Sequence, residues 1–127
     1  MSMQSPLNKV LGLGTAKEGT GHWWSQRLTA IGLVPLTLWF AFELLTLPHG
    51  NYEMVSAWIA QPLHSILIVL LIISLIYHSS LGLQVVIEDY VHGAAKVTVL
   101  VAVQLFNVLL AVAGIYAVIV VAVGAGG

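Results

Sequence analysis

The chain contains no cysteine, and only 7% of its 127 residues are charged. Without a thiolate, the chain by itself cannot ligate an iron–sulfur cluster, build a disulfide framework or perform thiol catalysis. Four basic and five acidic residues give a formal net charge of −1, which excludes a polybasic surface for nucleic acid. Any redox cofactor must therefore be held by other ligands.

Hydrophobic residues make up 59% of the chain, more than a soluble domain can cover with polar surface. A membrane helix needs about 20 predominantly apolar residues to cross roughly 30 Å of hydrocarbon. The chain has three such stretches, Leu28 to Leu47, Leu63 to Ile87 and Val97 to Val123. We therefore predict an all-α integral membrane protein with three transmembrane helices in one domain, residues 28–123.

The remaining residues set the expected orientation. Residues 1–27 are expected to form an N-terminal arm, irregular as far as Gly21 because of its proline and glycines, and 124–127 a short tail. The basic residues all precede the first stretch or separate the second from the third: Lys9, Lys17, Arg27 and Lys96. The positive-inside rule then predicts a cytoplasmic N-terminus and 88–96 loop. Without a signal-peptide or transit-peptide pattern, a bacterial inner membrane is favoured.

His78 stands deep inside the second apolar stretch, where an ionisable side chain is costly and is by default a functional-site hypothesis. Asp89 and Tyr90 follow about 16 Å further along the helix, at the membrane surface. Eleven helical steps return to nearly the same azimuth, so His78 and Asp89 are predicted to share a face. The helix would then present a metal-binding imidazole at mid-membrane and a protonatable pair at the cytoplasmic interface.

Several of these residues have two interpretations. Gly82, one turn from His78, makes room either for a flat macrocycle or for close helix packing. Arg27 either extends to lipid phosphates and cytoplasm or binds a carboxylate such as a haem propionate. His78 could form an interhelical hydrogen bond instead of binding a metal. Asp89 and Tyr90 could be a solvated helix end.

The other polar residues of the apolar stretches are expected to be structural. His64 has a helical spacing from His78 that would suit a second haem, but it lies at a helix entrance, so a solvated interfacial imidazole is favoured. Glu43, near the far end of the first stretch, is expected to be structural as well. Gln104 and Asn107 are expected to hydrogen-bond to a neighbouring helix.

One mid-membrane histidine cannot supply both axial ligands of a six-coordinate haem b. Either the iron is five-coordinate, or the other ligand comes from a partner subunit, which implies a hetero-oligomer. Tyr90 and Asp89 offer what quinone reduction needs at an interface. The phenol can hydrogen-bond to a carbonyl oxygen, and the carboxylate can orient that phenol or relay protons.

The segment from Ile76 to Val91, IYHSSLGLQVVIEDYV, resembles the signature of the small hydrophobic membrane-anchor subunit of succinate dehydrogenase, the smaller cytochrome b556 anchor of respiratory complex II. The shared pattern is a histidine, a glycine four residues on, and Asp-Tyr after eleven and twelve. The segment Arg27 to Ala30 is similar to the family's Arg-x-Thr-Ala element. The rest of the chain agrees in hydropathy.

This resemblance implies a set of partners and roles. In that family two three-helix anchors bind one haem b between them and fix an iron–sulfur subunit and a flavoprotein subunit to the bilayer, and the isolated anchor has no activity. By motif, His78 would be the axial haem ligand, Tyr90 a ubiquinone ligand, and Asp89 its neighbour in that site. Arg27 would contact a haem propionate, and Gly82 would provide packing room.

Three alternatives stay open. The chain could anchor fumarate reductase or another b-type cytochrome, including a dihaem form that uses His64. It could be a haem-less structural tether in which His78 bonds to a neighbouring helix. A proton-conducting transporter subunit that uses His78 and Asp89 as relays is disfavoured, because the chain has no inverted repeat and no second acidic residue at mid-depth.

Overall fold

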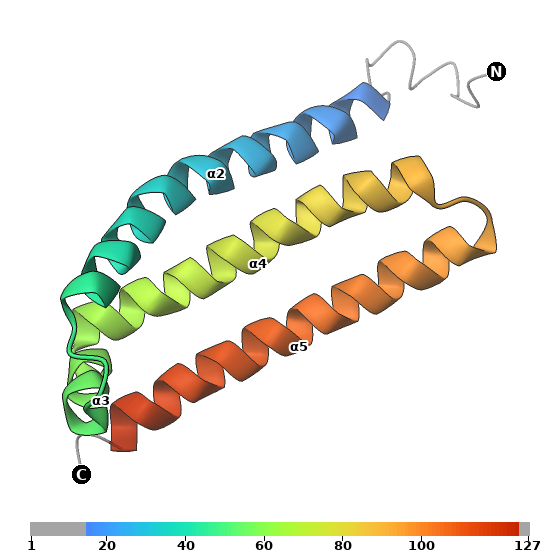
Figure 1. Cartoon of the computed structure of the whole chain (residues 1–127). Helices are drawn as coiled ribbons and strands as arrows, with labels where there is room; N and C mark the ends of the chain where they lie inside the picture. The colour runs from blue at the N-terminus through green and yellow to red at the C-terminus, as the bar shows by residue number, and fades with distance from the viewer. Residues whose placement is uncertain (1–14, 125–127) are drawn as a thin grey trace.

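The computed structural model describes residues 15–124. It contains four helices and, within those residues, no strand: α2 (Thr15–Thr46), α3 (Tyr52–Ala60), α4 (Pro62–Tyr90) and α5 (Ala94–Gly124). In Figure 1, α4 lies between α2 and α5, and the short α3 lies at the end of the molecule where α2 ends and α4 begins. The all-α prediction is confirmed.

Three of these helices are long and apolar enough to cross a bilayer, Thr20–Thr46, Pro62–Tyr90 and Ala94–Gly124. The second and third extend one to three residues past the predicted apolar stretch at each end, whereas the first begins well before Leu28 and ends at Thr46, one residue before Leu47. A 29-residue helix such as α4 is about 44 Å long, whereas the hydrocarbon layer is about 30 Å thick, so its ends reach the headgroup regions. The prediction of three membrane-spanning helices is confirmed.

The start of α2 differs from the prediction. Thr15–Gly21 is helical, although this segment was expected to be irregular. Each glycine costs about 1 kcal/mol in a helix, but once a helix exists each added residue gains a backbone hydrogen bond. The long apolar helix that follows therefore extends backwards through Gly19 and Gly21. The rest of the predicted arm, 1–14, and the tail at 125–127 lie outside the described residues.

The segment 48–61, which separates the first two predicted apolar stretches, contains helix α3, which was not predicted. Asn51 caps its N-terminus, because its side-chain oxygen accepts the Met54 backbone N–H at 3.1 Å. Glu53 places negative charge in the first turn, where it interacts favourably with the helix dipole. Gln61 ends the helix in an extended conformation, and Pro62 starts α4 at a position that suits proline.

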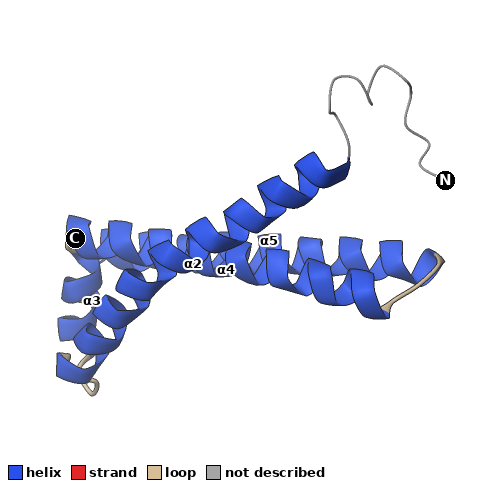
Figure 2. Cartoon of the chain, turned by 90° about the horizontal axis from the view of Figure 1, so that it is seen from above, coloured by secondary structure: helices blue, strands red, loops and turns tan. Residues whose placement is uncertain are grey.

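Helix α4 contacts both long neighbours, α2 and α5. It runs side by side with α5, whereas α2 crosses over this pair at an angle (Figure 2). Gly114 allows α5 to approach α4 closely, since a Cβ built there would lie 3.3 Å from the Ile72 Cδ1 atom. Helix α2 runs unbroken through Pro35 and bows along its length, as expected for a membrane helix that contains proline (Figure 1).

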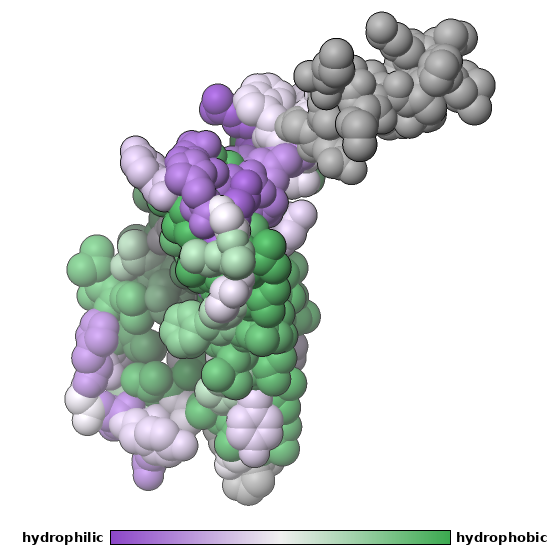
Figure 3. All heavy atoms as spheres, turned by 90° about the vertical axis from the view of Figure 1, so that its right-hand side faces the viewer, coloured by the Kyte–Doolittle hydropathy of each residue, from purple (hydrophilic) through white to green (hydrophobic). Residues whose placement is uncertain are grey.

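Few apolar side chains are buried within the described chain. Even the most buried keep some exposure: Leu33, Ile68, Leu71, Leu81, Ile87 and Val118. Figure 3 shows a broad hydrophobic zone across the middle of the molecule, with hydrophilic residues gathered towards the top and, more sparsely, at the bottom. Such a surface needs lipid or other membrane helices to cover it.

An aromatic cluster joins α2, α3 and α4 at the α3 end. The Trp58 indole N–H donates to a Glu43 carboxylate oxygen at 2.8 Å. The Trp58 ring stacks on Trp39 with centroids 6.0 Å apart and lies 4.6 Å from the His64 ring. His64 Nδ1 lies 2.9 Å from the Trp58 carbonyl oxygen, which can only accept a hydrogen bond, so Nδ1 carries a proton. The structural role predicted for Glu43 is confirmed.

This cluster makes a prediction for α3. Replacement of Trp58 by phenylalanine keeps a ring but removes the hydrogen bond to Glu43, which is typically worth about 1.5–3 kcal/mol when one partner is charged. We expect amide hydrogen exchange in α3 to become about tenfold faster. The matched control is Trp24→Phe, because Trp24 is 61% exposed at the other end of α2. Equal exchange in both variants would show that Glu43 does not hold α3.

Two polar residues of α5 behave differently from each other. The Ser80 hydroxyl donates to the Gln104 side-chain oxygen at 2.6 Å, so the predicted interhelical hydrogen bond of Gln104 is confirmed. Asn107 is buried, and its Nδ2 atom has no hydrogen-bond partner within the described residues. The interhelical hydrogen bond predicted for Asn107 is therefore not made by its Nδ2 atom within the described residues.

Candidate functional site between α2 and α4

His78 on α4 faces Thr29 on α2, with 3.0 Å between His78 Nδ1 and Thr29 Oγ1. The same hydroxyl lies 2.8 Å from the Ser25 carbonyl oxygen and 3.0 Å from that of Gln26. Carbonyl oxygens can only accept, so the threonine proton goes to one of them, and the hydroxyl oxygen accepts the Nδ1 proton of His78. This tautomer leaves a lone pair on His78 Nε2, which is the form of imidazole that binds metals.

The same face of α2 carries two more polar side chains. His22, Gln26 and Thr29 have i, i+4, i+7 spacing, so they form one stripe along the helix. His22 Nε2 and Gln26 Oε1 are buried but have no hydrogen-bond partner within the described residues. A Cβ built on Gly82 would lie 3.8 Å from Gln26 Nε2, so Gly82 faces this stripe. Buried polar atoms without partners are rare in proteins, so these two atoms are candidates for contact with a polar group from outside the described chain.

Arg27 lies on a different face of α2 and is exposed. Its guanidinium carbon is 5.3 Å from the centroid of the Trp23 ring, a cation–π distance. Within the described residues Arg27 forms no ion pair with a carboxylate. Its donors are therefore available to a group outside the part of the chain that the structure describes.

Asp89 and Tyr90 are the last two residues of α4, and both are exposed, Tyr90 by 81%. Beyond them, Val91 is extended and Gly93 has φ of +69°, a left-handed conformation that lets the chain turn into α5 within three residues. The pair lies about 16 Å along the helix axis from His78. The structure therefore does not bring His78 and Asp89 together, and it presents two sites at different depths.

Most of these residues could be named from the sequence, but the contacts between them could not. Thr29 belonged to a recognised motif but had no assigned role, and neither His22 nor Gln26 had one. The signal that was available is the helical spacing of these three polar residues on one face of an apolar helix. Within the described residues, no three His, Asp or Glu side chains gather as a metal site.

The fold and site define a multi-pass α-helical membrane protein with a partly buried polar site between two long apolar helices. A family model described as succinate dehydrogenase/fumarate reductase transmembrane subunit matches residues 1–125. The chain therefore belongs to the family of succinate dehydrogenase and fumarate reductase transmembrane subunits, as the resemblance in its motifs predicted.

Curated relatives carry a more specific name. The succinate dehydrogenase hydrophobic membrane anchor subunit of Rickettsia bellii is 38% identical over 116 residues, which covers 91% of this chain and 93% of the relative. The subunit of the same name from Rickettsia conorii is 31% identical, covering 90% and 92%. That of Paracoccus denitrificans is 26% identical, covering 95% and 94%. The chain is thus similar over most of its length to succinate dehydrogenase membrane anchors.

Proposed function

We propose that this anchor shares one haem b with a second membrane-anchor subunit and contributes to a ubiquinone-reduction site at the Tyr90 end. The observation that carries the proposal is the contact of His78 with Thr29, which orients the imidazole and leaves Nε2 free to bind iron. Metal-binding histidines usually donate their other ring N–H to a nearby acceptor in this way. In this proposal His78 would hold the haem from this chain, and the partner anchor would supply a second ligand.

The residues around His78 fit a haem. Gly82, one turn away, adds no side chain to the helix face beside the imidazole, and the nearest group to that face is the Gln26 side chain of α2, 3.8 Å from a Cβ built there. Within the described residues His22 Nε2 is buried without a partner, and it can donate a hydrogen bond that a haem propionate oxygen would accept. Gln26 Oε1 is also unpartnered there, but it can only accept and would need a donor from another group. Arg27 would hold a propionate through its planar, always charged guanidinium.

A bound haem would add an iron centre that accepts and returns single electrons between the two anchors. The chain's own residues would hold it and set its environment. Thr29 fixes the orientation and tautomer of His78, and the apolar helix faces around the site exclude water and lower the local dielectric.

At the end of α4, Tyr90 and Asp89 would bind ubiquinone. Reduction to ubiquinol takes up two electrons and two protons, so the site needs a hydrogen-bond donor to the quinone carbonyl and contact with water. The exposed Tyr90 phenol supplies the donor, and the neighbouring Asp89 carboxylate can orient the phenol or relay protons. In this proposal the α4–α5 turn and the N-terminus face the cytoplasm of a bacterial inner membrane.

The catalytic work of succinate oxidation would belong to other subunits. An iron–sulfur subunit and a flavoprotein subunit would dock on the cytoplasmic end, and electrons would pass from succinate through iron–sulfur clusters to ubiquinone beside Tyr90. The chain contains no cysteine and so cannot hold those clusters alone. It would act as a non-flavin membrane subunit without activity in isolation.

Replacement of Thr29 by valine tests the orientation of His78. Valine matches the shape of threonine but cannot accept the Nδ1 proton, and losing such a partner typically weakens metal binding about 10- to 100-fold. We expect the purified complex to lose haem faster to a haem-scavenging protein and to show a shifted low-spin electron paramagnetic resonance signal.

The matched control for this experiment is Thr37→Val on the same helix. The Thr37 hydroxyl bonds only to the backbone carbonyls of Leu33 and Val34, so its loss leaves His78 untouched. If Thr29→Val and Thr37→Val complexes retain haem equally well and give the same signal, Thr29 does not position a haem ligand.

A haem-less tether is the second candidate function, and one observation favours it. The contact between His78 and Thr29 is itself an interhelical hydrogen bond and contributes to packing whether or not iron is present. The two functions differ in the optical spectrum of the complex purified through this chain. A tether gives no haem absorbance, whereas the proposed function gives one low-spin haem per complex.

A further inference from the structure

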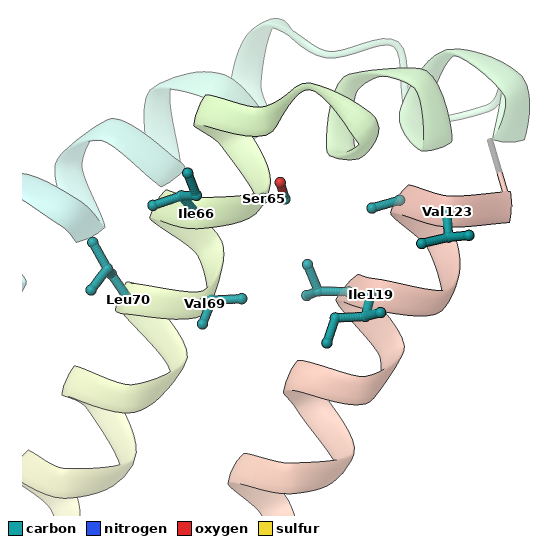
Figure 4. Close-up of a pocket in the computed structure, with 8 residues that line it drawn as sticks. Ser65, Ile66, Val69, Leu70, Ile119 and Val123 are labelled. Atoms are coloured by element: carbon teal, nitrogen blue, oxygen red, sulfur yellow. The ribbon is translucent and has the colours of Figure 1, made fainter. Parts of the chain in front are cut away.

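A groove runs between α4 and α5 near the α3 end of the molecule, with a volume of about 370 Å³ (Figure 4). Its walls are aliphatic and come from both helices: Ile66, Val69, Leu70, Val118, Ile119 and Val123. It is more than ten times larger than the roughly 30 Å³ that one water molecule occupies in the liquid. The groove therefore has room for an extended apolar chain.

The groove offers an occupant no free hydrogen-bond donor from a side chain. Ser65 is its one polar side chain, and the Ser65 hydroxyl lies 3.3 Å from the Gln61 carbonyl oxygen and 3.1 Å from that of Pro62. Its proton is therefore used within its own helix. The Ser65 oxygen can still accept a hydrogen bond, but the other walls are aliphatic, so hydrocarbon packing dominates the binding of an occupant such as a lipid acyl chain.

A polar hollow adjoins the mouth of the groove. Val123 lines the groove, and the next residue, Gly124, lines a second hollow of about 260 Å³ beneath α3. The other residues of that hollow come from α3 and include Tyr52 and Glu53. Tyr52 is 76% exposed and begins α3, in the segment that connects two spans, where a tyrosine at the membrane surface can contact lipid headgroups.

The segment around the polar hollow, residues 48–61, carries a negatively charged side chain and no lysine or arginine. This side chain is Glu53. Glu53 stabilises α3 because its negative charge lies in the first turn of the helix. The carboxylate is nevertheless exposed, and within the described residues it forms no ion pair. A headgroup here would meet an uncompensated negative charge, which attracts an ammonium group and repels an anionic lipid.

We propose that this groove and hollow bind one phospholipid with an amine headgroup, of the phosphatidylethanolamine class. One acyl chain lies in the groove between α4 and α5, and the ammonium group lies near Glu53. The site is at the opposite end of α4 from Tyr90 and is independent of haem and quinone binding.

Native mass spectrometry of the whole purified complex tests this proposal. The complex is exchanged with detergent micelles that contain equal amounts of dioleoyl phosphatidylethanolamine and dioleoyl phosphatidylglycerol, and the retained lipids are counted. We expect the wild-type complex to retain the ethanolamine lipid with about fivefold preference, the factor expected for one charge near a membrane surface. Glu53→Gln should abolish this preference, and Glu53→Lys should reverse it.

A second pair of variants tests the groove itself. Ala122 lines it, so Ala122→Leu should fill part of it and remove one retained lipid from the complex. The control is Ala117→Leu, an exposed position on the same helix that is not part of the groove wall. The intact mass of each complex reports assembly. A wild-type preference for the anionic lipid, equal lipid ratios in all Glu53 variants, or equal lipid counts in the two alanine variants would overturn the proposal.

Discussion

Replacement of His78 by alanine is expected to remove the low-spin haem spectrum from the purified complex. The imidazole is the only histidine in the interior of the three apolar stretches, and its contact with Thr29 gives it the orientation that the proposed function requires. Without it, the iron would keep only the partner's ligand. The predicted result is a haem content that falls from one per complex to nearly none, or a remaining haem that becomes high-spin.

His64→Ala provides the matched control. His64 lies at the entrance of the same helix, and its ring packs against Trp58 and Trp39 and is engaged with the Trp58 carbonyl. The proposal predicts an unchanged spectrum for this variant, whereas a dihaem protein would lose one haem. An unchanged spectrum and haem content in His78→Ala would refute the assignment of His78 as a ligand.

Replacement of Tyr90 by phenylalanine is expected to slow ubiquinone reduction by about 10- to 100-fold. A hydrogen bond to a group that develops charge is worth roughly 1.5–3 kcal/mol, and the loss of the phenol removes that bond while the ring remains. Succinate oxidation with a soluble artificial acceptor should stay at the wild-type rate, because those electrons need not reach the quinone site. Steady-state assays with both acceptors on one preparation measure the two rates.

Tyr116→Phe serves as the control for this substitution. Tyr116 is also largely exposed, at 68%, but it lies on α5 in the half of the helix that is remote from the α4–α5 turn. We expect it to leave both rates unchanged. If Tyr90→Phe lowered both rates equally, the defect would lie in assembly of the complex and not in quinone binding.

The long helices could be predicted because the bilayer imposes a simple rule. Backbone polar groups have no water partners in hydrocarbon, so apolar stretches such as those around Leu71 and Val112 must be helical and long enough to cross. Tertiary packing contributes little to this choice, and few side chains are buried.

The short elements at the membrane surfaces could not be predicted in the same way. Helix α3 depends on the Asn51 cap, on Glu53 in the first turn and on the contact of Trp58 with α2 and α4, which are local and tertiary features rather than hydropathy. The start of α2 differs from the prediction because Gly19 and Gly21 do not end the helix. They were outweighed by the cooperativity of the long helix that follows.

The candidate site was predictable in its chemistry but not in its contacts. His78 was evident because an imidazole at mid-membrane is costly, and the Asp89-Tyr90 pair because it ends the same helix. The contact with Thr29 joins residues 49 apart in the chain and depends on how α2 crosses α4. The unpartnered atoms of His22 and Gln26 likewise became visible only once the two helices were placed together.

A map of the assembled complex that resolves the region around His78 is the most direct measurement. The proposed function predicts a porphyrin beside α4, with its iron bonded to His78 Nε2 on one side and to a ligand from a second membrane subunit on the other. His78 Nδ1 would still face Thr29. An imidazole that faces lipid, or that packs among side chains with no porphyrin beside it, would contradict the proposed function.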